Sequence, residues 1–230
     1  MTENQRNTIY TIGHSNHPID KLSDALKKHN ITLLVDVRSH PGSQTSYLEQ
    51  YNRSKLKQEL STYGIDYQYM GDTLGGRPSD LSLYDEEGRA DYRKMASTEQ
   101  FTESIDAIKK LSKKYVIALM CLEEDPLNCH RGILLGRELT NRGLHVEHIR
   151  LTARRRPKNE VLYDDSTEDQ EELSQRLLRI ESQLSVFESS DRFNSSDPTE
   201  YFEYFWEKRW KSIAFRLNTG RKQSPSSFAH

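Results

Sequence analysis

The fold is decided by the stretch MCLEEDPLNCHRG at residues 120–132. The apolar, partly β-branched residues 115–119 before it predict a buried strand. The apolar stripe at residues 133–139 after it predicts a helix, which Gly143 is expected to end. A strand followed so closely by a helix is the repeating unit of an α/β fold.

The start of this helix is the first candidate for a functional site. Asn128 is a good N-cap, so Cys129, His130 and Arg131 are predicted to form the first helical turn. Free backbone N–H groups and the helix dipole favour an anion there. The same field would lower the pKa of the Cys129 thiol, and the guanidinium of Arg131 suits a phosphate or carboxylate.

Composition narrows the class of protein. The chain has 230 residues, of which 34% are hydrophobic and 30% charged, so it suits one domain with an appendage around a small core. The net charge of −2 gives no global attraction to nucleic acid or to an acidic membrane. Only two cysteines are present, and neither a signal peptide nor a membrane span is expected. We therefore expect a cytoplasmic protein.

Strands and helices alternate along the first two thirds of the chain. Strands are predicted at residues 8–12, 31–38, 65–70, 115–119 and 145–149. This pattern predicts a Rossmann-like parallel sheet of about five strands with helices on both faces, in the order 3-2-1-4-5. Ligands of such sheets bind beyond the carboxyl ends of the strands, where strands one and four would lie side by side.

Polar loops from four strands are expected to meet at that edge. Their candidate ligand-binding residues are His14, Ser15, Asp36, Arg38, Ser39, Gly75, Gly76, Glu123 and Arg131. Of these, His14 is also a candidate general base near neutral pH. Asp36 and Arg38 are equally well explained as a structural ion pair, and the Gly75-Gly76 pair as a simple turn.

The last third of the chain has a different composition. Residues 150–158 are basic and 160–172 mainly acidic, and helices are predicted at 168–188 and at the aromatic-rich 199–217. We therefore predict an α/β domain at 7–150 and a charged, largely helical extension at 151–217. The tail at 218–230 is expected to be disordered. The aromatic helix would pack against the main domain or a partner subunit, which makes a homo-oligomer one alternative.

Several short motifs together are similar to those of a known family. They are Thr11-Ile12-Gly13-His14-Ser15, Val35-Asp36-Val37-Arg38-Ser39 with Pro41 and Ser43, Leu74-Gly75-Gly76, Cys121 with Glu123, Cys129-His130-Arg131, and Val146 with His148-Ile149. In this order they resemble the domain of unknown function 488 family from the first to the fifth predicted strand. Tyr51 departs from the pattern, in which phenylalanine precedes the asparagine. The resemblance implies the fold and the place of the site, without a reaction.

Each of the two cysteines could also have a purely structural role. Cys121 ends an apolar strand and is expected in the core, whereas Cys129, beside His130 and Arg131, is the better candidate for chemistry. The cysteine spacing is not that of a zinc knuckle and no second pair follows, so no metal site is predicted. The number of residues between Cys121 or Cys129 and Arg131 also differs from the spacing in the cysteine–arginine loops of cysteine phosphatases and sulfurtransferases.

Three functions fit these features. The first is an enzyme of the hydrolase or transferase type that binds an anionic, phosphate-bearing ligand, nucleotide or nucleic acid, with Cys129, His130 or His14 performing the chemistry. The second is a binding module for the same ligands without turnover. The third is an interaction protein that assembles through its C-terminal helices. The sequence names no cofactor.

Overall fold

The computed structural model describes residues 8–42, 46–157, 161–187 and 197–217. Its strands are β1 (Thr8–Gly13), β2 (Leu33–Asp36), β3 (Asp66–Tyr69), β4 (Ile117–Cys121), β5 (His145–Arg155) and β6 (Val161–Asp169). Its α-helices are α1 (Ile19–Lys28), α2 (Arg53–Thr62), α3 (Gly71–Leu74), α4 (Tyr92–Ala96), α5 (Glu99–Leu111), α6 (Arg137–Asn141), α7 (Gln170–Phe187) and α8 (Pro198–Ile213). Shorter helical turns are η2 (Ser46–Tyr51), η3 (Leu81–Leu83), η4 (Pro126–Asn128) and η5 (Arg131–Gly136).

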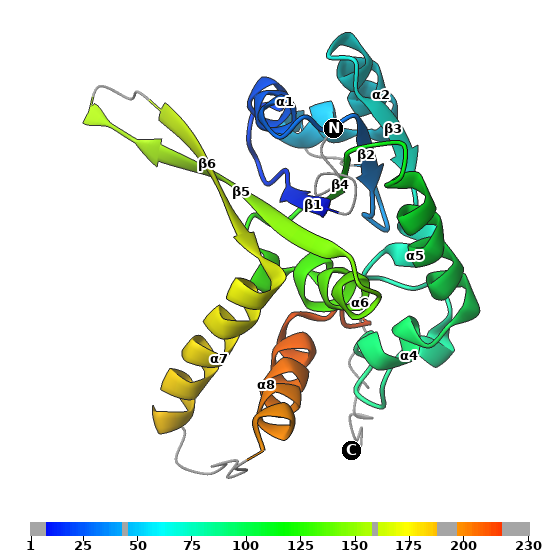
Figure 1. Cartoon of the computed structure of the whole chain (residues 1–230), viewed down its shortest axis with the longest axis vertical. Coiled ribbons are helices and arrows are strands. Elements are labelled where there is room, and N and C mark those ends of the chain that lie inside the picture. The colour runs from blue at the N-terminus through cyan, green and yellow to red at the C-terminus, as the bar shows by residue number, and fades with distance from the viewer. Residues whose placement is uncertain (1–7, 43–45, 158–160, 188–196, 218–230) are drawn as a thin grey trace, which may run out of the picture.

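The strands form one mixed sheet in the order β3-β2-β4-β1-β5-β6 (Figure 1). The first five strands of the chain are mutually parallel, as predicted, and β1 pairs with β4. The predicted order 3-2-1-4-5 is wrong, because β4 inserts between β2 and β1 and pairs with both. The carboxyl end of β4 therefore lies between those of β1 and β2, at the centre of the site edge.

Alternate residues of the central strand serve two separate cores. On β4, Ala118 and Met120 pack with α1 and α2, whereas Ile117, Leu119 and Cys121 face the core that includes α5, η5 and α8. Since successive side chains of a strand point to opposite faces, a buried strand must be apolar throughout, as residues 117–120 are. The expectation of helices on both faces is confirmed, and Cys121 lies on the η5 face.

The sequence did not predict the sixth strand. β6 pairs antiparallel with β5 from Glu147 opposite Asp169 to Arg155 opposite Val161, and the pair projects as a long ribbon (Figure 1). β6 carries the acidic residues that the sequence assigned to the start of the extension, and most of its side chains are at least partly exposed. The predicted division at residue 150 thus falls inside β5, and the predicted tail at 218–230 lies outside the described residues.

The two C-terminal helices pack onto the α/β sheet. Leu173 and Leu177 of α7 and Trp206 and Trp210 of α8 belong to the same buried core as Leu119. The indole Nε1 of Trp206 also donates a 2.8 Å hydrogen bond to the carbonyl of Ile133. The aromatic helix α8 therefore packs against the main domain, which was one of its two predicted alternatives. Within the described ranges, no helix combines the length and apolar character that a bilayer crossing needs.

Trp206 tests how far the C-terminal helices contribute to the fold. We expect Trp206→Ala to lower the free energy of unfolding by about 3–5 kcal/mol, because it leaves a cavity in the core and removes the donor to Ile133. Urea denaturation followed by circular dichroism measures this change. Leu81→Ala, at a side chain that is 69% exposed, is the control and should change stability little. Equal stability of the two variants would show that α8 is an independent appendage.

Candidate functional site

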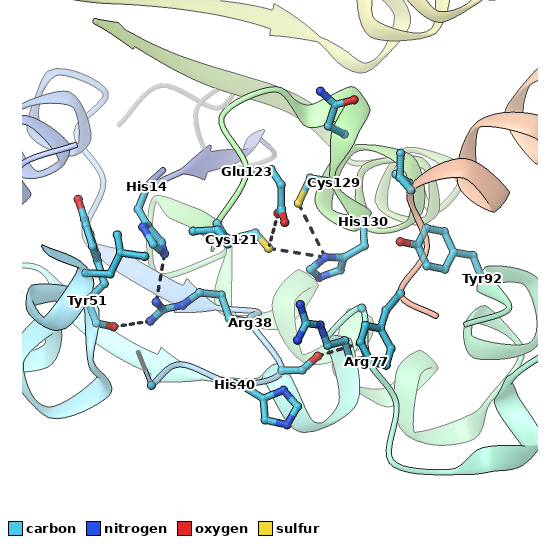
Figure 2. A pocket seen from close by; sticks show the side chains of 18 residues that line it. His14, Arg38, His40, Tyr51, Arg77, Tyr92, Cys121, Glu123, Cys129 and His130 are labelled. Atoms are coloured by element: carbon cyan, nitrogen blue, oxygen red, sulfur yellow. Dashed lines mark hydrogen bonds between the residues drawn. The ribbon is translucent and has the colours of Figure 1, made fainter. Parts of the chain in front are cut away.

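Cys121, Cys129 and His130 meet on one side of the sheet and are named here the sulfur–imidazole cluster. The Nδ1 atom of His130 lies 3.6 Å from Cys121 Sγ and 3.8 Å from Cys129 Sγ. All three ligand-type atoms lie within 4.8 Å of one another. The Glu123 carboxylate reaches the same place (Figure 2), and its Oε2 atom lies 3.4 Å from Cys121 Sγ.

The surroundings of the cluster shift the pKa values of its two thiols and its imidazole. The hydrogen bond from Cys129, together with the nearby charge of His130, holds the pKa of Cys121 well below its usual range, although burial alone would raise it. Burial and the hydrogen bond to Cys121 raise the pKa of Cys129 well above its usual range. Burial would lower the pKa of His130, but the charge of Cys121 outweighs it and the net pKa is raised. The pKa shifts of the two thiols are thus opposite in direction.

The helix start differs from the prediction in two ways. Asp125, rather than Asn128, caps the turn that follows the strand, accepting a hydrogen bond from the Leu127 N–H, and Cys129 is extended with φ −138° and ψ 142°. The helix begins with a π-helical turn at Arg131, so Cys129 precedes it rather than occupying its first turn. The expected lowering of the Cys129 pKa by the helix dipole is therefore wrong, since burial dominates.

Arg131 is fully buried and faces away from the cluster's cavity. Its Nη1 donates to Thr11 Oγ1 at 3.1 Å, and its Nη2 donates to the carbonyls of Glu123 and Glu124 at 3.1 and 2.6 Å. The guanidinium thus holds the backbone of the loop after β4 against β1. Its placement does not suit the anion-binding role that the sequence assigned to it, because its side chain is already used in the interior.

The Arg131 hydrogen bonds continue through the sheet to α7. Thr11 Oγ1 lies 2.7 Å from His148 Nδ1, and His148 Nε2 lies 2.9 Å from Gln170 Oε1. Burial, reinforced by the charge of Arg131, lowers the pKa of His148 to about 3, so the imidazole is neutral and can accept from Thr11 while donating to Gln170. This chain joins β1, β5 and α7 through the interior.

Arg38 is held rigidly beside the cluster. Its Nε and Nη2 bind the two oxygens of the fully buried Asp36 at 2.9 and 2.6 Å, and Nη2 also binds the Tyr51 carbonyl at 2.8 Å. Its Nη1 lies 3.1 Å from His14 Nε2 (Figure 2). The structural ion pair anticipated for Asp36 and Arg38 is found, and it aims the guanidinium at the site.

The position of His14 does not suit a general base. Its ring stacks on Tyr51 with a 3.9 Å centroid separation, and its two nitrogens contact the Ser15 carbonyl and Arg38. Burial and the positive charge of Arg38 lower its pKa to about 4. A neutral imidazole whose Nε2 accepts from Arg38 helps to orient that arginine.

A cavity of about 350 Å³ opens over the cluster. Its lining includes the guanidinium groups of Arg38 and Arg77 and the carboxylate of Glu123. Other lining residues are His14, Ser39, His40, Gly42, Leu48, Tyr51, Gly76, Tyr92, Cys121, Leu122, Asn128, Cys129, His130, Ile213 and Phe215. The charged residues of this lining thus include two arginines and one glutamate, and Arg38 is paired with the Asp36 carboxylate behind it.

Four of the sequence-predicted residues lie outside this lining: Ser15, Asp36, Gly75 and Arg131. Gly75 nevertheless supports the site, because a Cβ atom there would lie 2.3 Å from Ser39 Oγ, which accepts a hydrogen bond from the Arg77 N–H. Gly76 lines the cavity, and a Cβ atom there would crowd the His130 ring at 3.1 Å. Close approach to the imidazole, rather than to a ligand, thus explains the second glycine.

The C-terminal helices hold the loop that carries Cys129. Arg176 of α7 binds both oxygens of Asp125 at 2.9 and 2.7 Å, and these bonds bring the pKa of Asp125 to about 2 although burial raises it. Arg209 of α8 donates to the Leu127 carbonyl at 2.9 Å and to Asn128 Oδ1 at 2.6 Å. The predicted extension is therefore part of the site's framework, and Phe215 completes its wall.

Comparison with known families supports the expected family. The family model described as "Domain of unknown function DUF488" matches residues 18–137, just over half of the chain. The chain belongs to this family. No curated protein and no solved structure matches the chain significantly. The matched span of the DUF488 member contains Arg38, Gly76, Cys121, Cys129 and His130 but neither β5 nor the C-terminal helices.

Several residues of the site carried weak or no signals in the sequence. Cys121 lies in the core, as expected, and its position as the last residue of a buried strand also brings it to the cavity lining. Arg77 follows the Gly75-Gly76 pair and was not singled out. Tyr92 and Phe215 lie far from the motifs along the chain, and only the packing of α4 and of the segment after α8 brings them to the cavity.

Arg131 is predicted to be structural. We expect Arg131→Met to lower the free energy of unfolding by about 2–4 kcal/mol, because the carbonyls of Glu123 and Glu124 lose their buried donor. Urea denaturation measures the change, and Arg179→Met, at an exposed arginine of α7, should stay within about 0.5 kcal/mol of the parent. Unchanged stability combined with lost phosphate binding would instead return Arg131 to the anion-binding role.

Proposed function

We propose that the chain is an enzyme of the hydrolase or transferase type that binds a phosphate-bearing ligand, a nucleotide or nucleic-acid end, in the cavity over the sulfur–imidazole cluster. The observation that carries the proposal is the lining of this cavity. It combines Arg38 and Arg77 with a buried set of reactive side chains, Cys121, Cys129 and His130.

Arg38 and Arg77 differ in a way that suits binding. Arg38 is fixed by Asp36 and Tyr51 before any ligand arrives, so it loses little conformational entropy on binding. Arg77 is exposed and rests over the Phe215 ring at 4.6 Å, where it can swing onto a ligand. Guanidinium groups match phosphate oxygens in pairs, and a cavity of about 350 Å³ is within the range that small ligands occupy.

The side chains proposed to carry out the reaction share the cavity with the proposed anion site. Cys121, Cys129 and His130 line the same cavity as the arginines, and Glu123 adjoins them (Figure 2). An anion held by Arg38 and Arg77 would present its neighbouring atoms to this cluster, which is the arrangement that proximity and electrostatic catalysis require. The chemistry is thus assigned to the cluster as a whole, with Cys121 included and His14 left to orient Arg38.

Anion binding is tested with inorganic phosphate and pyrophosphate. We expect isothermal titration calorimetry to show binding to the parent protein and a roughly tenfold weaker Kd for Arg77→Met, because a hydrogen bond to a charged group contributes about 1.5 kcal/mol. Arg179→Met is the control with the same loss of charge and should bind as the parent does. Binding that is insensitive to Arg77→Met would place the anion elsewhere.

Measuring turnover distinguishes an enzyme from a module that only binds the ligand. Product release is measured over a panel of ligands, as inorganic phosphate from nucleotides and phosphomonoesters and as the freed alcohol from phosphodiesters, with Cys121→Ala as the variant. We expect release by the parent protein, and its loss in Cys121→Ala while pyrophosphate still binds through the arginines. Binding without release anywhere on the panel would favour the module that senses such ligands without converting them.

A further inference from the structure

The separations within the sulfur–imidazole cluster match those of ligands around a metal ion. Tetrahedral zinc has Zn–S bonds of about 2.3 Å and Zn–N bonds of about 2.0–2.1 Å, which place sulfur and nitrogen ligands about 3.6 Å apart. The observed distances from His130 Nδ1 are 3.6 Å to Cys121 Sγ and 3.8 Å to Cys129 Sγ. Both sulfur–nitrogen separations therefore match those around a single ion, and the two sulfur atoms lie within 4.8 Å of each other.

Most side-chain hydrogen bonds of this group lie within it. The two sulfur atoms and His130 Nδ1 contact one another and Glu123, while the backbone of Leu122 and of Val37 adds interactions with Cys121 and His130. All three residues are buried, with 5% of Cys121, 2% of Cys129 and 7% of His130 exposed. Two thiols and an imidazole turned toward one point in the interior form a donor set that suits a borderline-soft ion such as Zn²⁺.

The cluster is open on one side. Its three residues line the cavity, and so does Glu123, whose Oε2 atom is 3.4 Å from Cys121 Sγ. Structural zinc sites are closed by four protein ligands, whereas catalytic sites have three and keep a position for water or substrate. A carboxylate beside that position can accept a proton from a water molecule bound there.

We infer that Cys121 Sγ, Cys129 Sγ and His130 Nδ1 bind a Zn²⁺ ion whose fourth position faces the cavity beside Glu123. The use of that position on a phosphate-bearing ligand rests on the proposed function, whereas the binding of the metal does not. The sequence prediction of no metal site relied on spacing along the chain. Here the ligands come from the end of a strand and the loop before a helix, and they meet only in the fold.

Metal content and cobalt substitution test the site. The full chain, purified without a histidine tag, is expected to contain one Zn²⁺ per molecule by mass spectrometry. After removal of zinc with a chelator, added Co²⁺ should give the thiolate-to-cobalt charge-transfer absorption and the visible bands of a tetrahedral site. We expect Cys129→Ser and His130→Asn to lose both the zinc and the charge-transfer absorption. His145→Asn, at an exposed histidine, is the control and should keep them.

Measuring thiol reactivity in the parent protein tests the metal site even if a variant does not fold. In the parent protein, Zn²⁺ should slow alkylation of Cys121 and Cys129 by iodoacetamide, and the chelator should restore it. Alkylation at the same rate with and without the chelator, together with no cobalt absorption, would overturn the inference. Phosphate binding to such a protein would leave the proposed function standing. A cobalt spectrum without any phosphate binding would support the metal site and remove the anion-binding function.

Discussion

The guanidinium of Arg131 is buried among the carbonyls of Glu123 and Glu124 and the hydroxyl of Thr11, and the loop after β4 takes its path around it. A buried charge is tolerated only when its donors are satisfied, so these oxygens fix where the loop runs. The loop also approaches β1 so closely that a Cβ atom at Gly13 would lie 1.8 Å from the Glu123 carbonyl. The position of Glu123 at the cavity depends on this constraint.

The pleat of β4 supplies the other half of the site. Because Cys121 shares a face with Ile117 and Leu119, its thiol points to the side of the sheet on which η5 packs. Cys129 and His130 come to the same side from the loop before η5. A strand shifted by one residue would turn Cys121 toward α1 and α2, away from both. The cluster is therefore a product of strand register and of the loop path that Arg131 sets.

The C-terminal third, which lies outside the family match, strengthens the same loop from the other side. Arg176 and Arg209 bind Asp125, Leu127 and Asn128, while Trp206 and Trp210 place α8 in the core next to η5. Phe215 then forms part of the cavity wall beneath Arg77. The C-terminal third, which the sequence predicts to be a charged appendage, thus stabilises the cavity and sets part of its shape.

The sequence by itself determined the α/β class, the five parallel strands and most of the edge at which the site lies, because apolar periodicity and turn residues are local signals. It also pointed to Cys129, His130, Arg38 and Glu123. Only the tertiary structure decided that β4 separates β1 from β2, that β6 exists, and that Cys121 lines the cavity while Arg131 is buried outside its lining. These outcomes depend on which face a side chain takes and on what fills the space beside it, and neither is encoded in spacing along the chain.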